Sequence, residues 1–395
     1  MLHRPLALLL ALLPACDTLS RSSIEPAAPA SVDPREGRVA LPAAAEGWEA
    51  SLVWDAGSTG VWRVDSLDVF PQYASREVVA LDDRGRLMVA VPYSGRWTPF
   101  ETVHEGVWLG GLAQGDVDSD VAGLELYTAS QGGNVWQIVA WPEGVLDSRR
   151  IAHLGRAVHT LVSADLDPFS SGDELLAFTD PGALYQLEPG GPAGTFEVRS
   201  LGERPGRVRD AVALPFQVGR LTEVATASRD GRLELLSLTP DGPRWSLVHR
   251  ASSGLGRVAL APPLGEGATV LYSTADDGRV LRHERAARGG EWRTETIYLG
   301  PEGPRGLAAG RFADPGTEAV AVFGYSGRVE LLTRQGGEWS AETLFEDRDR
   351  GHWLASAELD GRNGTDELLA CGYGGRVVLL ARRAGYGRDE LASEL

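Results

Sequence analysis

Asp277-Gly278-Arg279-Val280-Leu281 places a glycine between two short apolar runs, and the same arrangement returns along the whole chain. The glycines follow one another at intervals of 48, 49, 49, 47, 49 and 48 residues, at Gly85, Gly133, Gly182, Gly231, Gly278, Gly327 and Gly375. A period of this length, with a tight turn between two strand-like runs, is typical of one four-stranded propeller blade per repeat. The sequence therefore predicts an all-β chain that forms a seven-bladed β-propeller.

The remaining strands of each repeat can be placed around the glycine. An acid opens the apolar run before it, eight residues upstream at Glu77, Glu125, Glu174, Glu223 and Glu367 and nine upstream at Glu318. These runs are short and free of proline, as buried second strands should be. An outer fourth strand carries tryptophan, because Gly290-Glu291-Trp292 is echoed 47 residues later by Gly337-Glu338-Trp339.

The two ends of the repeat region complement each other. The last repeat stops after its third strand, at Leu379-Leu380-Ala381-Arg382, whereas Gly47-Trp48-Glu49 repeats the outer-strand pattern ahead of the first blade. An N-terminal strand that completes the C-terminal blade would leave no open sheet edge. We therefore expect one closed propeller domain over residues 46–383.

The segments outside the propeller have a different character. Residues 1–15 combine a basic start with an apolar stretch that is too short to span a bilayer, which predicts a signal peptide. Leu13-Pro14-Ala15-Cys16 resembles a bacterial lipoprotein signal, and this resemblance implies that Cys16 is acylated. Residues 16–45 are then expected to form a lipidated flexible tether, and residues 384–395 are expected to form a flexible acidic tail. The expected location is a bacterial cell membrane, with the propeller facing the periplasm or the exterior.

Charge narrows the range of partners. The formal net charge is −17, and all 38 basic residues are arginine. A nucleic-acid-binding protein would need a basic face to replace phosphate counterions, so this class is excluded. The absence of lysine also excludes Schiff-base catalysis and a lysine general base.

Three loops between expected first and second strands are rich in acids. Their acidic residues are Asp116, Asp118, Asp120 and Glu125 in blade 2, Asp165, Asp167 and Asp173 in blade 3, and Glu358, Asp360 and Asp366 in blade 7. Alternate acids on a tight loop can converge several oxygens on a hard cation.

These loops carry a family resemblance. Asp116-Val117-Asp118-Ser119-Asp120, followed by Glu125 and an apolar strand, resembles the FG-GAP and VCBS propeller repeats, which include the head of the integrin α-subunit. The resemblance implies calcium in such loops, with blade 2 offering the best set. The alternative is that these carboxylates cap turns, because the acid that opens the second strand persists in blades 1 and 4 without an acid-rich loop.

A second candidate site lies where the innermost strands begin, 21 to 24 residues before each glycine. The main candidates there are His159, Arg257, Arg305 and His352, accompanied by Trp62, Gly110 and Arg207. Converging guanidinium groups with tryptophans would bind carboxylates or acidic sugars, and histidine protonation would strengthen this binding below about pH 6.5. The alternative is that each arginine pairs with a neighbouring blade and holds the ring together.

These patterns favour a binding or scaffold module of the cell envelope, with a protein or a glycan as ligand. The alternatives are a carbohydrate-binding propeller and a calcium-dependent polysaccharide lyase. Aromatic pockets that recur between blades would favour the lectin, and an arginine paired with a general base in one channel pocket would favour the lyase. Catalysis has the least support and no residue is assigned a catalytic role, because none of the common catalytic motifs occurs in the chain.

Overall fold

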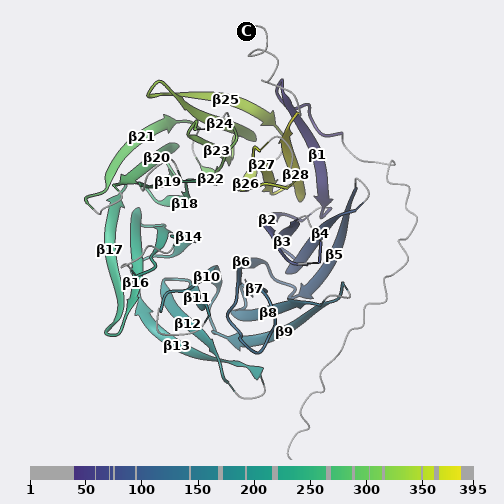
Figure 1. Ribbon diagram of the computed structural model, residues 1–395, viewed down its shortest axis with the longest axis vertical. Coiled ribbons are helices and arrows are strands. Elements are labelled where there is room, and N and C mark those ends of the chain that lie inside the picture. Colours follow the sequence, from purple (N-terminus) through teal and green to yellow (C-terminus); the bar gives the residue numbers. More distant parts are fainter. Residues whose placement is uncertain are drawn as a thin grey trace, which may run out of the picture. The chain divides into compact units, whose positions relative to one another are not determined.

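The structure is a computed structural model, which describes residues 40–383 apart from 58, 71, 74–75, 94–95, 142–143, 168–171, 192–193, 216–220, 264–267, 287–289, 302, 314–315, 348–349 and 360–363. The described residues form seven four-stranded sheets around a central channel, and they contain no α-helix (Figure 1). This confirms the prediction of an all-β, seven-bladed propeller. Within that part of the chain, no helix is long and apolar enough to cross a membrane.

Each of the first four blades is a sheet of consecutive antiparallel strands. Blade 1 consists of β2 (Val61–Leu67), β3 (Glu77–Asp82), β4 (Arg86–Tyr93) and β5 (Arg96–His104). Blade 2 consists of β6 (Leu109–Gly115), β7 (Glu125–Ser130), β8 (Asn134–Ala140) and β9 (Leu146–His153). Blade 3 consists of β10 (Val158–Ala164), β11 (Glu174–Thr179), β12 (Ala183–Pro189) and β13 (Phe196–Glu203). Blade 4 consists of β14 (Val208–Ala213), β15 (Val224–Ser228), β16 (Arg232–Thr239) and β17 (Gly242–Arg250).

The last three blades include the closure of the ring. Blade 5 consists of β18 (Leu255–Leu260), β19 (Thr269–Ala275), β20 (Arg279–Arg285) and β21 (Arg293–Leu299). Blade 6 consists of β22 (Pro304–Ala309), β23 (Ala319–Gly324), β24 (Arg328–Gln335) and β25 (Glu338–Glu346). Blade 7 consists of β26 (Gly351–Ala357), β27 (Glu367–Gly372), β28 (Arg376–Arg382) and the N-terminal strand β1 (Trp48–Asp55).

Strand β1 closes the ring as the sequence predicts. It pairs antiparallel with β28, in a register that runs from Trp48 opposite Arg382 to Asp55 opposite Arg376. Trp48, Val53 and Trp54 on β1 are buried. The N-terminal strand therefore supplies both the missing edge of blade 7 and part of its apolar packing.

The backbone conformation of each hairpin between second and third strands explains why the repeated residue is glycine. Gly85 and Gly375, for example, have φ angles of 78° and 81°, which side chains rarely adopt. A Cβ atom at Gly375 would also overlap the carbonyl oxygen of Thr59, which lies in the connection from β1 to β2. The hairpin thus needs glycine both for its turn and for its contact with the connection that leads to the next blade.

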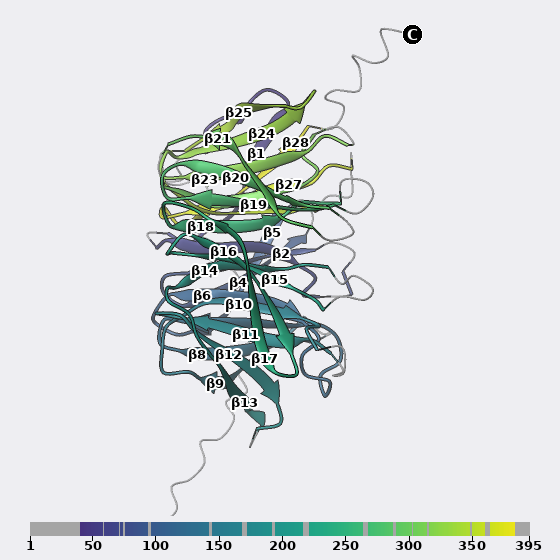
Figure 2. The same ribbon diagram turned by 90° about the vertical axis from the view of Figure 1, so that its left-hand side faces the viewer.

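Apolar side chains fill the spaces between adjacent blades. Val270 and Tyr272 of blade 5, for instance, pack in one cluster with Leu307 and Val320 of blade 6. The strands run from one face of the propeller to the other, as the edge-on view shows (Figure 2). The starts of the innermost strands and the glycine hairpins therefore meet on one face, and the loops that join first to second strands lie on the opposite face.

Candidate functional site

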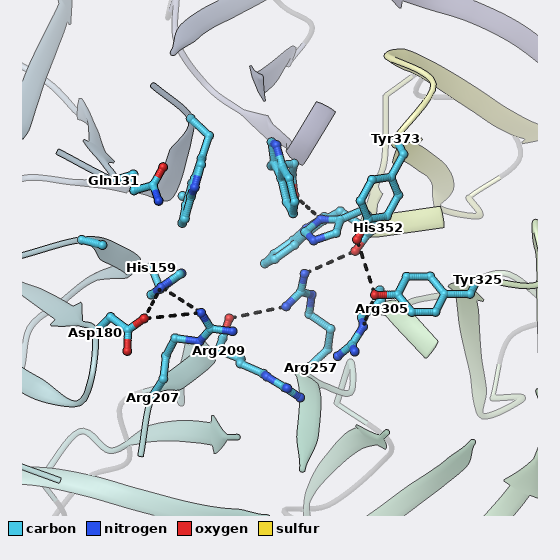
Figure 3. Close-up of a pocket in the computed structure, with 15 residues that line it drawn as sticks. Gln131, His159, Asp180, Arg207, Arg209, Arg257, Arg305, Tyr325, His352 and Tyr373 are labelled. Carbon is cyan, nitrogen blue, oxygen red and sulfur yellow. Dashed lines mark hydrogen bonds and ion pairs between the residues drawn. The ribbon is translucent and has the colours of Figure 1, made fainter. Parts of the chain in front are cut away.

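A cavity of about 390 Å³ lies at the mouth of the central channel, on the face of the glycine hairpins (Figure 3). All four predicted ligand-binding residues, His159, Arg257, Arg305 and His352, line it, although they come from blades 3, 5, 6 and 7. The cavity falls in the usual range for small-molecule pockets, about 300–1,000 Å³. We call it the mouth cavity. The structure brings the predicted residues together, and their role in binding stays a prediction.

Arginines of blades 4, 5 and 6 form one side of the mouth cavity: Arg207, Arg209, Arg257 and Arg305 (Figure 3). Arg209 and Arg305 share a single carboxylate, since Nη1 of each lies 2.9 and 2.8 Å from Oδ1 of Asp276. Nη1 of Arg207 lies farther, at 3.6 Å, from Oδ2 of Asp180. The guanidinium groups therefore outnumber the carboxylates that face them, and this side of the cavity keeps a positive charge.

Arg257 forms the inner end of the mouth cavity together with Trp353. Its side chain is buried, and its guanidinium carbon lies 4.0 Å from the centre of the Trp353 ring. The Nη atoms donate to the carbonyl oxygens of Arg209 at 3.5 Å and His352 at 3.3 Å, so this arginine of blade 5 reaches blades 4 and 7. Arg257 thus links blades 4, 5 and 7 at the wall of the cavity.

The inter-blade contacts match the structural alternative that the sequence left open. Each arginine of the mouth cavity contacts an acid or a carbonyl oxygen of another blade, as Arg209 and Arg305 do through Asp276 of blade 5. They differ in exposure, however, because the side chain of Arg305 is 20% exposed whereas Arg257 as a whole is 6% exposed. Holding the ring and facing a ligand are compatible for the more exposed arginines.

Aromatic rings of blades 7, 1 and 2 form the other side of the mouth cavity. Trp62 lies at the centre of this group, with ring centroids 5.9 Å from Trp108, 5.5 Å from Tyr373 and 4.4 Å from His352. Trp108 in turn lies 5.0 Å from the ring of His159. The cavity is therefore two-sided, with planar apolar surfaces opposite guanidinium groups.

Several buried donors at the cavity lack an acceptor among the described residues. They are Nε1 of Trp62, Nε of Arg207 and Nε of Arg257. A buried donor without an acceptor costs about 1–3 kcal/mol, and native proteins satisfy nearly all such groups. These three nitrogens are buried within the cavity wall, so they are not counted among the groups that face a ligand.

The two histidines do not supply the pH-dependent charge that the sequence suggests. Burial, together with the charge of Arg207, lowers the pKa of His159 to about 4. Burial and the charge of Arg257 hold the pKa of His352 well below its ordinary value. The expected gain of positive charge below about pH 6.5 is wrong, because both imidazoles remain neutral at that pH. The sequence could not reveal how deeply the rings are buried.

Two tyrosines of the cavity were missed from the sequence. Tyr325 and Tyr373 line it, and both stand two residues before their hairpin glycine, in the same register as Gln131, Asp180 and Asp276. The hydroxyl oxygens of the two tyrosines are 3.5 Å apart, and Nε of Arg305 donates to Oη of Tyr325 at 3.3 Å. The position two residues before the hairpin glycine holds a different residue from blade to blade, and this variation is the signal that would have identified the two tyrosines.

The acid-rich loops lie on the opposite face, where the strand-opening glutamates accept backbone hydrogen bonds. Oε2 of Glu125 accepts from the N–H groups of Val117 at 3.0 Å and Asp118 at 3.3 Å. Glu77, Glu174 and Glu367 accept in the same way from residues seven or eight positions upstream. The proposed turn-capping role of these acids is therefore observed in four blades.

Three of the other predicted metal ligands, Asp118, Asp173 and Asp366, also have protein partners. Oδ2 of Asp118 lies 2.6 Å from Nη2 of Arg149, and its Oδ1 accepts from the N–H of Asp120 at 3.2 Å. Asp173 accepts from the N–H of Asp116 in blade 2, and Asp366 pairs with Arg311 of blade 6 at 2.9 Å. Asp165, Asp167 and Glu358 follow the innermost strands of blades 3 and 7.

Within the described part of the chain, no three His, Cys, Asp or Glu residues are grouped so that they could hold a metal ion. Asp360 and the predicted lipidation site Cys16 lie outside the described residues. The calcium and lipidation predictions stay predictions.

The sequence matches no protein-family model, and no curated protein matches it at significant similarity. The likeness to FG-GAP and VCBS repeats therefore stays a resemblance in period and loop pattern. Only the residues of the sites themselves can carry an argument about function.

Proposed function

We propose that this protein is an exported, lipid-anchored binding module of the bacterial cell envelope, and that it binds an acidic glycan end at the mouth cavity. The ligand class is a sugar residue that carries a carboxylate, such as a uronic acid. The anchoring half of the proposal rests on residues 1–16 of the sequence, and the binding half rests on the cavity.

The observation that carries the binding half is the two-sided lining. A uronate has a charged edge, which guanidinium groups hold by charge-assisted hydrogen bonds, and a ring face that stacks on aromatic side chains. Arg207 and Arg305 face the channel from one side, and Trp62 and Trp108 face it from the other. Both parts of such a ligand can therefore be satisfied at once.

The inner end of the cavity supports recognition of a chain end. Arg257 is buried and packs on Trp353 among the residues that line the cavity, and we take these two side chains as its floor, which a polymer could not thread through. A terminal residue can enter, whereas an internal residue would have to bring its two neighbours with it. The formal net charge of the whole chain is −17, so the arginines of the mouth cavity are a local exception that attracts anions.

Calorimetric titration tests the binding half with a matched pair of ligands. The propeller is titrated with short oligouronates and with the same oligomers as methyl esters, which keep the ring and lose the charge. We expect binding of the acids to weaken with added salt and to fall by about tenfold or more on esterification, since one hydrogen bond to a charged group contributes about 1.5–3 kcal/mol. Equal affinity for acid and ester would contradict the proposal, and absence of binding to both would leave the propeller as a scaffold.

Membrane fractionation tests the anchoring half. The Cys16→Ser variant cannot be acylated, and acyl chains supply membrane affinity through buried methylene groups. We expect the wild-type protein in the membrane fraction and the variant in the soluble fraction. An unchanged membrane-bound pool would contradict lipid anchoring without affecting the binding half.

A further inference from the structure

Tyr325 and Tyr373 form a paired polar centre at the edge of the mouth cavity, next to the arginines (Figure 3). Arg305 donates to Oη of Tyr325 at 3.3 Å, and its guanidinium carbon lies 5.3 Å from the Tyr325 ring. The guanidinium of Arg350 faces both rings, at 5.7 Å from Tyr325 and 4.9 Å from Tyr373. Two cations thus lie beside a pair of tyrosine rings whose hydroxyl oxygens are 3.5 Å apart.

The pKa values of the two hydroxyl groups are shifted in opposite directions. The hydrogen bond shared with Tyr373, the hydrogen bond from Arg305 and the nearby positive charges lower the pKa of Tyr325. Burial, with the hydrogen bond to Tyr325, raises the pKa of Tyr373 to about 12. Neighbouring titratable groups whose environments separate their pKa values are the usual arrangement of a general base and a general acid.

We propose that Tyr325 and Tyr373 are the general base and general acid of a β-elimination that cleaves a 4-linked uronic acid residue held in the mouth cavity. The proposal rests on the proposed function, because the arginines must first hold the carboxylate. From the sequence, an arginine paired with a general base in one channel pocket is the feature that would favour a lyase, and Arg305 with Tyr325 is such a pair. It needs neither a metal ion nor a redox partner.

The elimination proceeds by moving one proton onto Tyr325 and another off Tyr373. The Tyr325 phenolate removes the proton from C5 of the uronate, and the electron pair left on C5 delocalises into the carboxylate, whose added charge guanidinium groups stabilise. The C4–C5 double bond then forms as the C4–O4 bond breaks, and Tyr373 donates its proton to the departing O4. The products are a 4,5-unsaturated uronate and a shortened chain, and the return of one proton from Tyr325 to Tyr373 resets the site.

The proposed floor of Arg257 and Trp353 adds a constraint on the direction of the chain. A uronate can be cleaved only if its O4 carries the leaving residue. A terminal uronate that enters the cavity and is cleaved must therefore lie at the reducing end, with O4 pointing out of the channel. The expected product is an unsaturated monosaccharide released from that end.

The test incubates the full-length protein with 4-linked oligomers of galacturonate, glucuronate and mannuronate. The unsaturated acid absorbs in the ultraviolet, so product is followed by absorbance and identified by mass. Affinity is measured on the same samples by titration. We expect the Tyr325→Phe variant to lose about a hundredfold or more in rate, as removal of a general base does, while it keeps its affinity.

The control variant is Tyr298→Phe, which removes a hydroxyl that donates to Glu330 outside the mouth cavity. It is expected to leave rate and affinity unchanged. The rate of the wild-type protein should rise with pH as Tyr325 ionises, below the ordinary tyrosine pKa of about 10, and Tyr325→Phe should abolish that rise. A wild-type protein that binds an oligouronate and forms no unsaturated product overturns this inference and leaves the proposed function intact. Absence of binding overturns both.

Discussion

The two faces of the propeller differ in how far their residues are repeated from blade to blade. On the acid-loop face, Glu77, Glu125, Glu174 and Glu367 occupy one position of the repeat and accept equivalent backbone hydrogen bonds. On the mouth face, one position of the repeat holds Trp62, Gly110, His159, Arg257, Arg305 and His352, with a different chemistry from blade to blade.

The difference separates residues that make a blade from residues that make a site. A side chain repeated from blade to blade serves a need that those blades share, such as satisfying the loop N–H groups. A position that varies gives the channel mouth its two unlike sides, arginines from blades 4 to 6 and aromatic rings from blades 7, 1 and 2. Substitutions at the two kinds of position should therefore affect different properties.

The largest expected effect comes from removing the closing strand. Deletion of residues 17–57 takes away β1 and with it the buried side chains of Trp48, Val53 and Trp54. Each buried apolar side chain contributes about 1.5–3 kcal/mol, so the free energy of unfolding should fall by about 5 kcal/mol or more. Deletion of residues 17–40, which leaves β1 in place, is the control and should melt near the full-length temperature. Equal melting temperatures for both truncations would show that β1 is dispensable.

Substitution of a repeated glutamate should destabilise the fold and spare the site. Glu125→Ala leaves the N–H groups of Val117 and Asp118 and the hydroxyl of Tyr127 without their acceptor. We expect a loss of about 3 kcal/mol in denaturant unfolding, with ligand affinity unchanged. Glu342→Ala, at an exposed position of β25, is the control and should change stability by less than about 0.5 kcal/mol. A loss of affinity in Glu125→Ala would break the separation between the two faces.

The pH dependence of binding should be flat over the range in which ordinary histidines titrate. Because the pKa of His159 is lowered to about 4 and that of His352 also lies well below its usual value, neither ring gains charge between pH 7.5 and about pH 5.5. Affinity for an oligouronate, titrated at both pH values, should therefore agree within about twofold. A marked gain in affinity at the lower pH would show that the histidines belong to the cationic side of the cavity.

Calcium should have the smallest effect. Asp118 is paired with Arg149, and Glu125 accepts backbone hydrogen bonds, so these carboxylates already have partners. We expect thermal melting to be the same with and without calcium. An ion bound only by the folded protein at about a hundredfold over its Kd would instead add about 2.7 kcal/mol. Such a gain, abolished in the Asp116→Asn and Asp118→Asn double variant, would establish a metal site in blade 2.

The fold could be predicted from the sequence because the hairpin glycine recurs in all seven blades and other features of the repeat recur in most of them. The hairpin glycine, the strand-opening acid and the outer tryptophan recur within one or two residues of a fixed period, and Trp48 supplies the missing copy at the other end. Local spacing was also sufficient to place His159, Arg257, Arg305 and His352 at one end of the channel.

The properties of the site were less accessible, because they depend on contacts across the ring. No spacing in the sequence reveals that Arg257 of blade 5 donates to the carbonyl oxygen of His352 in blade 7. The ion pair between Arg149 and Asp118 is equally invisible in the sequence. Burial depth likewise decided the pKa of His352 and left no trace in the sequence. Tyr325 and Tyr373 were recognisable only once the channel-facing register was known.

The most direct test of the account is the affinity of an oligouronate for a double variant of the mouth cavity. Arg207→Gln with Arg305→Gln removes the two more exposed guanidinium groups, and Arg311→Gln removes one guanidinium from the opposite face as the control. We predict that affinity in calorimetric titration falls about a hundredfold or more in the double variant, with the free energy of unfolding lowered by no more than about 1 kcal/mol. The control should bind as the wild type does. Unchanged affinity in the double variant, or a comparable loss in Arg311→Gln, would contradict the claim that the mouth cavity is the binding site.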